Sequence, residues 1–309
     1  MSAAQSAVCP DATADVIAAI EELDPPRFAL RVYPAAGAVE ELIERLQGHA
    51  VVISDGTRID AAVLAQCSDL RAIVFLGTGV DFYINRPACE RSGILLEGIR
   101  GYGDRTVAEH AFALMLAVYR DLGSQQELMR GGGWGGMPIG ELGGKTLGVV
   151  GLGGVGTELA RLASGFGMKV IGWSRSGTGD GACDRVELQQ LLAQSDVVSL
   201  HLAAVPGTAN FIDARKIDAM KPGAVLINTA RASLVDERAL LKALASGHLA
   251  GAGLDVYERE PPASEAAIRS APSVVLSCHS AWRSPEATRE LVRRAYARVD
   301  DLVAEWRIQ

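Results

Sequence analysis

Short apolar runs alternate with longer amphipathic stretches along most of the chain. From Phe28 onward, strand-like runs such as FALRVY, HAVVIS, RAIVFLG and ILLEGI are separated by helix-like stretches such as AVEELIERLQG and IDAAVLAQC. This alternation predicts strands joined by helical crossovers, and therefore a parallel sheet with helices on its faces.

A second series of the same kind begins at Thr146. It contains six strand-like runs, TLGVVG, KVIGW, VVSLH, AVLINTA, AGAGLDV and VVLSCH, most of them separated by helix-like stretches. Six strands suit a complete dinucleotide-binding sheet. After them, Ser284 and Pro285 can serve as N-cap and first residue of a last helix that runs to Trp306. We expect this helix to return to the first domain.

The segment between the two series predicts a helix and a linker. Thr106 and Glu109 have the spacing of a capping box before AFALMLAVYR, whose nearly all-round apolar character favours burial between domains or subunits. The glycine-rich stretch RGGGWGGMPIGELGG is typical of a loop or linker. A length of 309 residues is too great for one core. We therefore predict two doubly wound α/β domains with a cleft between them: a flavodoxin-like substrate domain of residues 1–104 and 283–309, and a Rossmann dinucleotide-binding domain of residues 105–282.

Charge and cysteine content exclude several classes of protein. Lys and Arg number 30 and Asp and Glu 37, so the net charge of −7 offers no footprint for nucleic acid. Five cysteines without a Cys-x-x-Cys pair argue against a disulfide framework or a zinc site, and favour a reducing compartment. The longest apolar run, Ala111 to Tyr119, is too short for a membrane span, and the first residues lack a secretory pattern. We expect a cytoplasmic protein without a metal.

One glycine cluster predicts a cofactor site. Six residues fit the pattern G-x-G-x-x-G between a strand-like and a helix-like run: Gly151, Leu152, Gly153, Gly154, Val155 and Gly156. The first glycine permits the tight turn, the second lets the backbone approach a pyrophosphate, and the third allows close packing of helix on strand. A purely structural glycine turn would show the same letters, but the strand, helix and strand around it favour dinucleotide binding.

The end of the next strand-like run indicates which dinucleotide is preferred. KVIGW is followed by Ser174, Arg175 and Ser176, and the first acid comes only at Asp180. An acid at this place favours NAD, whereas an arginine fork can accept the 2′-phosphate of NADP. Arg175 can also be read as a solvated loop arginine. We expect NADP(H) to be preferred, with NAD(H) possible.

Polar residues that follow the strand-like runs are the catalytic candidates, because ligands of parallel sheets bind at the carboxyl ends of the strands. Arg231 would hold the carboxylate and carbonyl oxygens of a 2-keto acid. His279 would exchange a proton with the carbonyl oxygen, and Glu260 would favour the protonated imidazole. In the first domain, the backbone N–H groups of the turn Gly77-Thr78-Gly79 could bind the carboxylate. The set suits hydride transfer to a 2-keto acid.

Each of these residues has an alternative interpretation. Arg231 could form a surface ion pair, and His279 alone could be structural. Glu258 competes with Glu260, since spacing does not choose between them. Cys278 could suggest a thiol nucleophile, but a buried strand cysteine is the expected reading. A serine hydrolase is disfavoured because no G-x-S-x-G sequence is present.

The ordered motifs resemble those of the D-isomer-specific 2-hydroxyacid dehydrogenases, from about Phe28 to Trp306. GKTLGVVGLGGVG, INTARASLVDE, GLDVYEREP and SCHSAW stand in the family's order and spacing, and LGTGVD and TVAEHA match its first-domain and hinge signatures. The resemblance implies that Arg231, Glu260 and His279 form the catalytic set and that Asp255 holds the nicotinamide carboxamide. It also implies that three residues lie near the cofactor or its adenine pocket: Thr106, His201 and Thr208. The family usually has Gly where this chain has Ala232, and Pro where it has Cys278. The stretch 201–208 lacks the Pro and the first Thr that are usual in the family.

Finer resemblances suggest a substrate. WSRS is similar to NADPH-dependent glyoxylate and hydroxypyruvate reductases of the family. HSAW resembles members that place an indole in the substrate pocket, including C-terminal-binding transcriptional corepressors, so Trp282 either contacts the substrate or packs at the domain junction. Formate oxidation is disfavoured because formate dehydrogenases of the family resemble this motif with Gln in place of Glu260. Phosphite oxidation is disfavoured because the phosphite enzyme has a Lys in the first-domain loop, which this chain lacks.

The leading hypothesis is an NADP(H)-preferring reductase of small 2-keto acids, a homodimer by family resemblance. The alternative, an NAD(P)-sensing regulator of corepressor type, is opposed by the lack of long disordered flanks or a basic patch.

Overall fold

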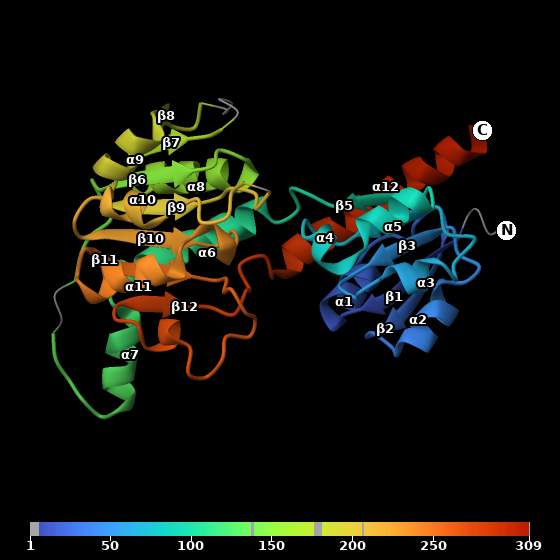
Figure 1. Cartoon of the computed structure of the whole chain (residues 1–309), viewed down its shortest axis with the longest axis horizontal. Helices are drawn as coiled ribbons and strands as arrows, with labels where there is room; N and C mark the ends of the chain where they lie inside the picture. The colour runs from blue at the N-terminus through green and yellow to red at the C-terminus, as the bar shows by residue number, and fades with distance from the viewer. Residues whose placement is uncertain (1–5, 137–138, 176–180, 206, 309) are drawn as a thin grey trace. The chain divides into compact units, whose positions relative to one another are not determined.

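The computed structural model describes residues 6–136, 139–175, 181–205 and 207–308, which form two compact units (Figure 1). Unit 1 comprises Met1–Gly103 with Arg283–Gln309, and unit 2 comprises Asp104–Trp282. The boundary after Gly103 falls one residue before the one expected from the sequence. The boundary between Trp282 and Arg283 coincides with the expected one.

Unit 1 is built on a five-stranded parallel sheet of order β2-β1-β3-β4-β5. Its strands are β1 (Ser6–Ala12), β2 (Ala29–Pro34), β3 (Val51–Ser54), β4 (Ala72–Phe75) and β5 (Leu95–Gly98). The order is that of flavodoxin-like doubly wound sheets. The predicted fold class of this unit is confirmed.

Helices cover both faces of this sheet, as alternate strand residues require. Val8, Val52 and Ile73 face one core layer, and Ala7, Val51 and Val74 face the other. The helices are α1 (Ala14–Glu22), α2 (Val39–Leu46), α3 (Ala61–Leu64), α4 (Val80–Tyr83), α5 (Arg86–Arg91) and α12 (Pro285–Ile308).

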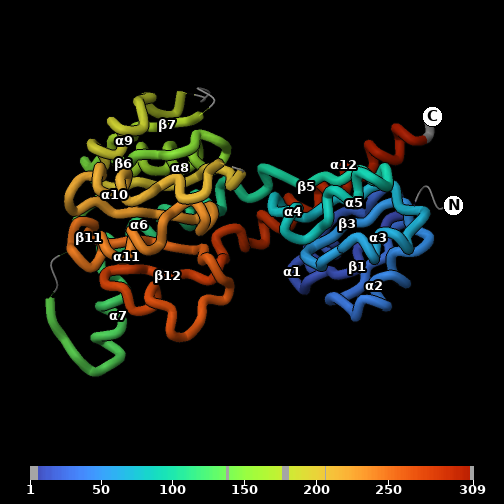
Figure 2. The backbone as a smooth tube through the Cα atoms, viewed as in Figure 1, coloured from blue at the N-terminus to red at the C-terminus, as the bar shows by residue number. Residues whose placement is uncertain are grey.

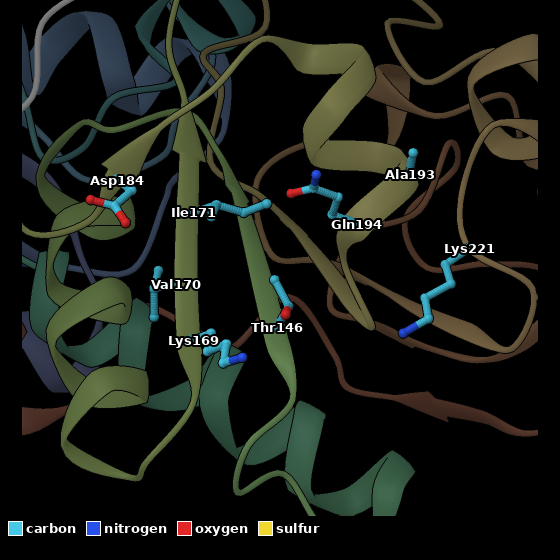
Figure 3. A pocket seen from close by; sticks show the side chains of 8 residues that line it. All are labelled: Thr146, Lys169, Val170, Ile171, Asp184, Ala193, Gln194 and Lys221. Carbon is cyan, nitrogen blue, oxygen red and sulfur yellow. The ribbon is translucent and has the colours of Figure 1, made fainter.

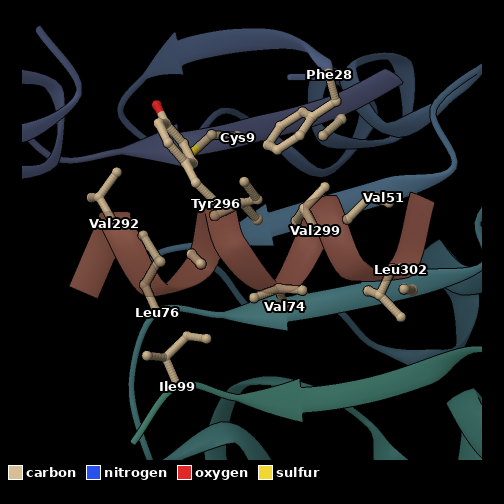
Figure 4. Packing of buried hydrophobic residues seen from close by; sticks show 14 of the residues in the cluster. Cys9, Phe28, Val51, Val74, Leu76, Ile99, Val292, Tyr296, Val299 and Leu302 are labelled. Carbon is tan, nitrogen blue, oxygen red and sulfur yellow. The ribbon is translucent and has the colours of Figure 1, made fainter. Parts of the chain in front are cut away.

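The last helix, α12, is part of unit 1, although the whole of unit 2, Asp104–Trp282, stands between it and the first part of unit 1 in sequence. Val292, Tyr296 and Val299 recur at helical spacing on one face and are buried against the sheet (Figure 4). The Tyr296 ring meets Phe28 edge to face, with ring centroids 5.8 Å apart. In the tube view, the red C-terminal segment lies with the blue N-terminal segments of the same unit (Figure 2). The expected return to the first domain is what the structure has.

The N-terminal strand β1 was not predicted, because Pro10 interrupts its apolar pattern. Proline is rare in central strands, since it lacks an N–H for the ladder. Here β1 pairs with β3 only through Ala7 and Val8, and its register with β2 shifts between Cys9 and Ala12. Pro10 therefore lies beyond the residues that pair with β3.

Unit 2 contains a seven-stranded parallel sheet of order β12-β11-β10-β9-β6-β7-β8. Counted from β6, this is the Rossmann order with one further strand at the edge. The strands are β6 (Thr146–Val150), β7 (Lys169–Trp173), β8 (Asp184–Arg185), β9 (Val197–Leu200), β10 (Ala224–Asn228), β11 (Leu249–Leu254) and β12 (Val274–Leu276). The Rossmann prediction is confirmed; the two-residue β8 was not predicted.

The helices of unit 2 lie on the faces of this sheet, apart from α7. They are α6 (Asp104–Tyr119), α7 (Leu122–Arg130), α8 (Gly154–Gly165), α9 (Leu188–Gln194), α10 (Ala214–Asp218) and α11 (Glu237–Ala245). In the described part of the chain, no helix has both the length and the apolar character of a membrane span.

The start of α6 differs from the prediction. The helix begins at Asp104, so Thr106 is already helical and cannot act as the N-cap of a capping box. The buried residues of α6, among them Ala111, Leu114 and Met115, pack in a core of unit 2 with β6 and α8. One face of α6 is therefore buried within its own unit.

Candidate functional site

The turn between β6 and α8 has the geometry that the glycine motif predicted. Gly151 has a φ of 107°, which L side chains rarely adopt, and a Cβ on Gly156 would lie 1.9 Å from the Gly151 carbonyl oxygen. A Cβ on Gly153 would meet nothing within 4 Å, so this side of the turn is open. Leu152 and Val155 pack with the core beside the turn, and Gly154 begins the helix.

This turn fits a dinucleotide pyrophosphate. Gly153 is the N-cap of α8 and has no side chain that could bond the first N–H groups of the helix. Those N–H groups and the helix dipole favour an anion at the same place. The open side of Gly153 gives such an anion room to approach the backbone.

The next strand ends with the residues expected near the adenosine ribose. Ser174 is half-buried and Arg175 is exposed directly after β7, which pairs with β6 in parallel. The carboxyl ends of both strands therefore share one edge of the sheet. The third predicted residue, Ser176, lies outside the described residues.

Two further cofactor candidates follow β9. The His201 Nε2 atom lies 2.8 Å from the Ser199 hydroxyl, and burial lowers the pKa of His201 to about 4, so its imidazole is neutral near pH 7. Its carbonyl carbon lies 2.7 Å from the Cβ position of Gly151, against the glycine turn. The buried Thr208 hydroxyl donates to the Val205 carbonyl at 2.8 Å and accepts from the Val205 N–H at 2.9 Å. Thr208 thus shapes the loop after β9.

The structure brings His279 and Glu260 together. The His279 Nδ1 atom lies 2.6 Å from the Glu260 Oε2 atom, and the two side chains are 36% and 38% exposed. A carboxylate only accepts, so Nδ1 carries the hydrogen and Nε2 is left for another partner. Within the described residues nothing bonds Nε2. Glu258, the rival candidate, is exposed and has no bond to His279.

Arg231 follows β10 at the same edge of the sheet. Its backbone is held by the Asn228 amide, which donates to the Arg231 carbonyl at 3.0 Å, and its Nη1 donates to the Ala230 carbonyl at 2.7 Å. Among the described residues, no carboxylate forms an ion pair with this half-buried guanidinium. A cation without a counter-charge suits a bound carboxylate.

The three catalytic candidates therefore follow three neighbouring strands, β10, β11 and β12. Because these strands are parallel, the residues stand at the carboxyl edge that also holds the glycine turn.

Asp255, predicted near the nicotinamide, is fully buried after β11. Its carboxylate accepts from the Ser277 hydroxyl and from the Ser280 and Ala281 N–H groups. The neighbouring Cys278 is exposed, which corrects the expectation of a buried strand cysteine. The reason is that β12 ends at Leu276, so Cys278 belongs to the loop that carries His279.

The remaining candidates are placed as follows. Gly77, with a φ of 150°, begins the turn after β4, and Gly79 is the N-cap of α4. In the described chain neither the Thr78 nor the Gly79 N–H donates a hydrogen bond, so both stay candidates for a carboxylate. Trp282 is half-buried at the end of unit 2, and Thr106 lies in the first turn of α6.

A surface hollow of about 550 Å³ lies at the other edge of the unit 2 sheet (Figure 3). It is lined by the first residues of β6 and β7 and by side chains from β8, α9 and the segment before β10: Thr146, Lys169, Val170, Ile171, Asp184, Ala193, Gln194 and Lys221. Ligands of doubly wound sheets bind at the carboxyl ends of strands. This hollow is therefore separate from the candidate site.

A Rossmann sheet with a glycine turn and a His–Glu pair at one edge is typical of dinucleotide-dependent dehydrogenases. The sequence profile of the family "D-isomer specific 2-hydroxyacid dehydrogenase, NAD binding domain" matches residues 112–281. The chain belongs to the D-isomer-specific 2-hydroxyacid dehydrogenase family, and it is an oxidoreductase with an NAD(P)-binding domain.

Relatives and solved structures agree with this assignment. The chain is 37% identical over 282 residues to glycerate dehydrogenase of Methylorubrum extorquens, with 88% of each chain covered. It is 36% identical over 267 residues to glyoxylate reductase of Thermococcus litoralis, covering 82% of this chain and 80% of the relative. The structure of the acyclic imino acid reductase Bsp5 in complex with NADPH and D-Arg matches with a TM-score of 0.83 and 30% identity over 97% of both chains. These names are those of enzymes and do not favour the regulatory alternative.

Proposed function

We propose that the protein is an NADP(H)-preferring reductase of small 2-keto acids such as glyoxylate or hydroxypyruvate, with the D-2-hydroxy acid as product. The observation that carries the proposal is the His279–Glu260 pair, with Nδ1 and Oε2 2.6 Å apart at the sheet edge that also holds the glycine turn. The names of the relatives, glycerate dehydrogenase and glyoxylate reductase, support the substrate class.

Each side chain has one chemical task in this proposal. The reduced nicotinamide, when bound, supplies the hydride. Arg231 binds the substrate carboxylate through its guanidinium and draws electron density towards the carbonyl oxygen. His279 gives its Nε2 proton to that oxygen as the alkoxide forms, and takes a proton back in the oxidation direction. Glu260 stabilises the imidazolium and fixes the ring by its bond to Nδ1.

The preference for NADP(H) rests on the end of β7. Arg175 is exposed two residues after Trp173, the last residue of the strand, at the place where sheets of this type bind a 2′-phosphate. Its planar fork can bind phosphate bidentately. The Bsp5 structure, with NADPH, supports the same preference.

The proposed homodimer is supported by α7. This helix extends away from the sheet of unit 2 (Figure 1), none of its residues is buried, and Leu122 and Met129 are 53% and 55% exposed. Trp134, shortly after it, is 89% exposed. An isolated nine-residue helix is marginal in water, so a second copy of the chain is the partner that would cover it. Sedimentation velocity should give a dimer mass for the wild type and for the unit 1 control Val39→Glu, but a monomer mass for Met129→Glu. A wild-type monomer would refute the dimer.

The reductase proposal is tested by turnover of a panel of 2-keto acids with NADPH and NADH. We expect NADPH-dependent reduction of glyoxylate or hydroxypyruvate, and a loss of about 100-fold to 10,000-fold in kcat for His279→Ala. His248→Ala is the matched control, because His248 bonds the Ile217 carbonyl at 3.0 Å and stands before β11, at the far edge of the sheet. Absence of turnover with every acid, or an equal loss in both variants, would refute the proposal.

A further inference from the structure

His279 has a backbone conformation that needs support. Its φ of 49° lies in the left-handed region, which residues with a Cβ rarely occupy. Such a conformation persists only where the surrounding structure over-determines it. The bonds made by the residues on either side of His279 therefore show what holds the imidazole in place.

Asp255 bonds both sides of His279. Its Oδ1 accepts from the Ser280 N–H at 2.9 Å and from the Ser277 hydroxyl at 2.6 Å, and its Oδ2 accepts from the Ala281 N–H at 2.9 Å. The His110 Nε2 atom lies 2.9 Å from the same Ser277 hydroxyl. Since the hydroxyl proton is directed to the carboxylate, its oxygen accepts from His110.

Tyr257 adds a second point of attachment, because it is bonded both to Glu260 and to the segment that carries His279. Its hydroxyl donates to the Ser277 carbonyl at 2.6 Å, two residues before His279, and its backbone N–H donates to Glu260 Oε1 at 3.0 Å. A longer contact of 3.2 Å joins the hydroxyl to the Leu254 carbonyl. Burial, helped by the nearby Asp255 carboxylate, raises the pKa of Tyr257 to about 12, so the hydroxyl keeps its proton near neutral pH.

We propose that Tyr257 is a positioning residue for the reaction: its hydroxyl fixes the segment 277–281 and, through it, the His279 imidazole against Glu260. The proposal rests on the reductase function proposed above. Removal of the hydroxyl frees the Ser277 carbonyl and leaves Asp255 as the main restraint on the segment. His279 then spends less time in its left-handed conformation, so proton transfer to the bound substrate becomes slower.

The test compares Tyr257→Phe with Tyr119→Phe. Tyr119 is the matched control, because its hydroxyl also donates to a backbone carbonyl, that of Asp196 at 3.4 Å, just before β9 at the far edge of the same sheet. For Tyr257→Phe we expect kcat to fall by about tenfold, the loss of one hydrogen bond, with little change in KM or in the affinity for NADPH. The kinetic isotope effect with deuterated NADPH should rise, because chemistry becomes more rate-limiting. Tyr119→Phe should change none of these.

Amide hydrogen exchange gives a readout that does not depend on turnover. Exchange of the peptide 277–282 should be several times faster in Tyr257→Phe than in the wild type, and unchanged in Tyr119→Phe. Unchanged exchange of this peptide in Tyr257→Phe would overturn the inference whatever the activity. Faster exchange with wild-type kcat and isotope effect would overturn it as well. If the wild type turns over no 2-keto acid, the reductase proposal fails, and the exchange measurement alone decides whether Tyr257 holds the segment.

Discussion

Two glycines of the 151–156 turn should respond to alanine differently. Gly153 has φ −80° and ψ −167°, which alanine adopts freely, and an added Cβ would meet nothing within 4 Å. Gly153→Ala should change stability by less than about 1 kcal/mol, because the gain of about 0.4–1 kcal/mol from the unfolded chain is offset by the poorer N-cap character of alanine. A Cβ on Gly156 would lie 1.9 Å from the Gly151 oxygen, more than 1 Å short of ordinary contact. Such overpacking costs about 1–3 kcal/mol, or a fall in Tm of about 2–12 °C for a unit of this size.

Cofactor affinity should separate the two variants further. The methyl of Gly153→Ala occupies the space through which a pyrophosphate reaches the N–H groups of α8. Loss of one charge-assisted hydrogen bond, worth about 1.5–3 kcal/mol, raises the Kd for NADPH by about 10- to 100-fold. The assay is a fluorescence titration with NADPH beside a thermal melt without it. Gly165→Ala, at the other end of α8 and also in open space, is the control and should bind normally. Wild-type affinity in Gly153→Ala, or a Tm loss equal to that of Gly156→Ala, would refute the reasoning.

Two further substitutions test charge placement. Arg175→Asp should shift the ratio of kcat/KM values by at least about tenfold from NADPH towards NADH, because it replaces a phosphate partner by a repelling carboxylate; an unchanged ratio would show that Arg175 points elsewhere. Burial raises the pKa of Asp196, but bonds from Lys221 at 2.5 Å and from the Thr146 N–H outweigh it and hold the pKa below its ordinary 3.8. The resulting stabilisation is complete above that ordinary value and is lost as pH falls through the lowered pKa. Urea unfolding should therefore show Asp196→Asn less stable than wild type by about 1–3 kcal/mol at pH 7, with the difference shrinking as the pH falls below 3.8. A pH-independent difference would contradict this assignment.

The sequence predicts those parts of the site that depend on strand direction. Arg231, Glu260 and His279 each follow an apolar run, and parallel strands bring such positions to one edge whatever their separation in the chain. The glycine turn is predictable for a similar reason, because its spacing is set by local backbone geometry. The doubly wound class of both sheets is predictable from the alternation of strand-like and helix-like runs, whereas β1 and β8 were not predicted.

Features that depend on contacts between distant side chains could not be predicted in this way. His110 and Ser277 are 167 residues apart, and no periodicity links them. Tyr257 reads as an ordinary aromatic after a strand, because its hydrogen-bond partners are backbone carbonyls that carry no sequence signal. The misplacement of Cys278 came from extending an apolar run by two residues, where only the end of strand pairing separates strand from loop.

We propose that Asp255 connects the support of His279 with the cofactor. A buried carboxylate is costly unless several donors bond it, and its two oxygens offer about four acceptor positions. Among the described residues, three of these positions are used around His279, and Oδ2 accepts only from Ala281. One acceptor position thus has no donor among the described residues, and the family resemblance assigns the nicotinamide carboxamide to this aspartate. If Asp255 serves both partners, Asp255→Asn should weaken NADPH binding and lower kcat together, whereas Tyr257→Phe lowers kcat alone. Titration and steady-state kinetics on both variants decide the matter: an Asp255→Asn protein with normal NADPH affinity would restrict Asp255 to the support of His279.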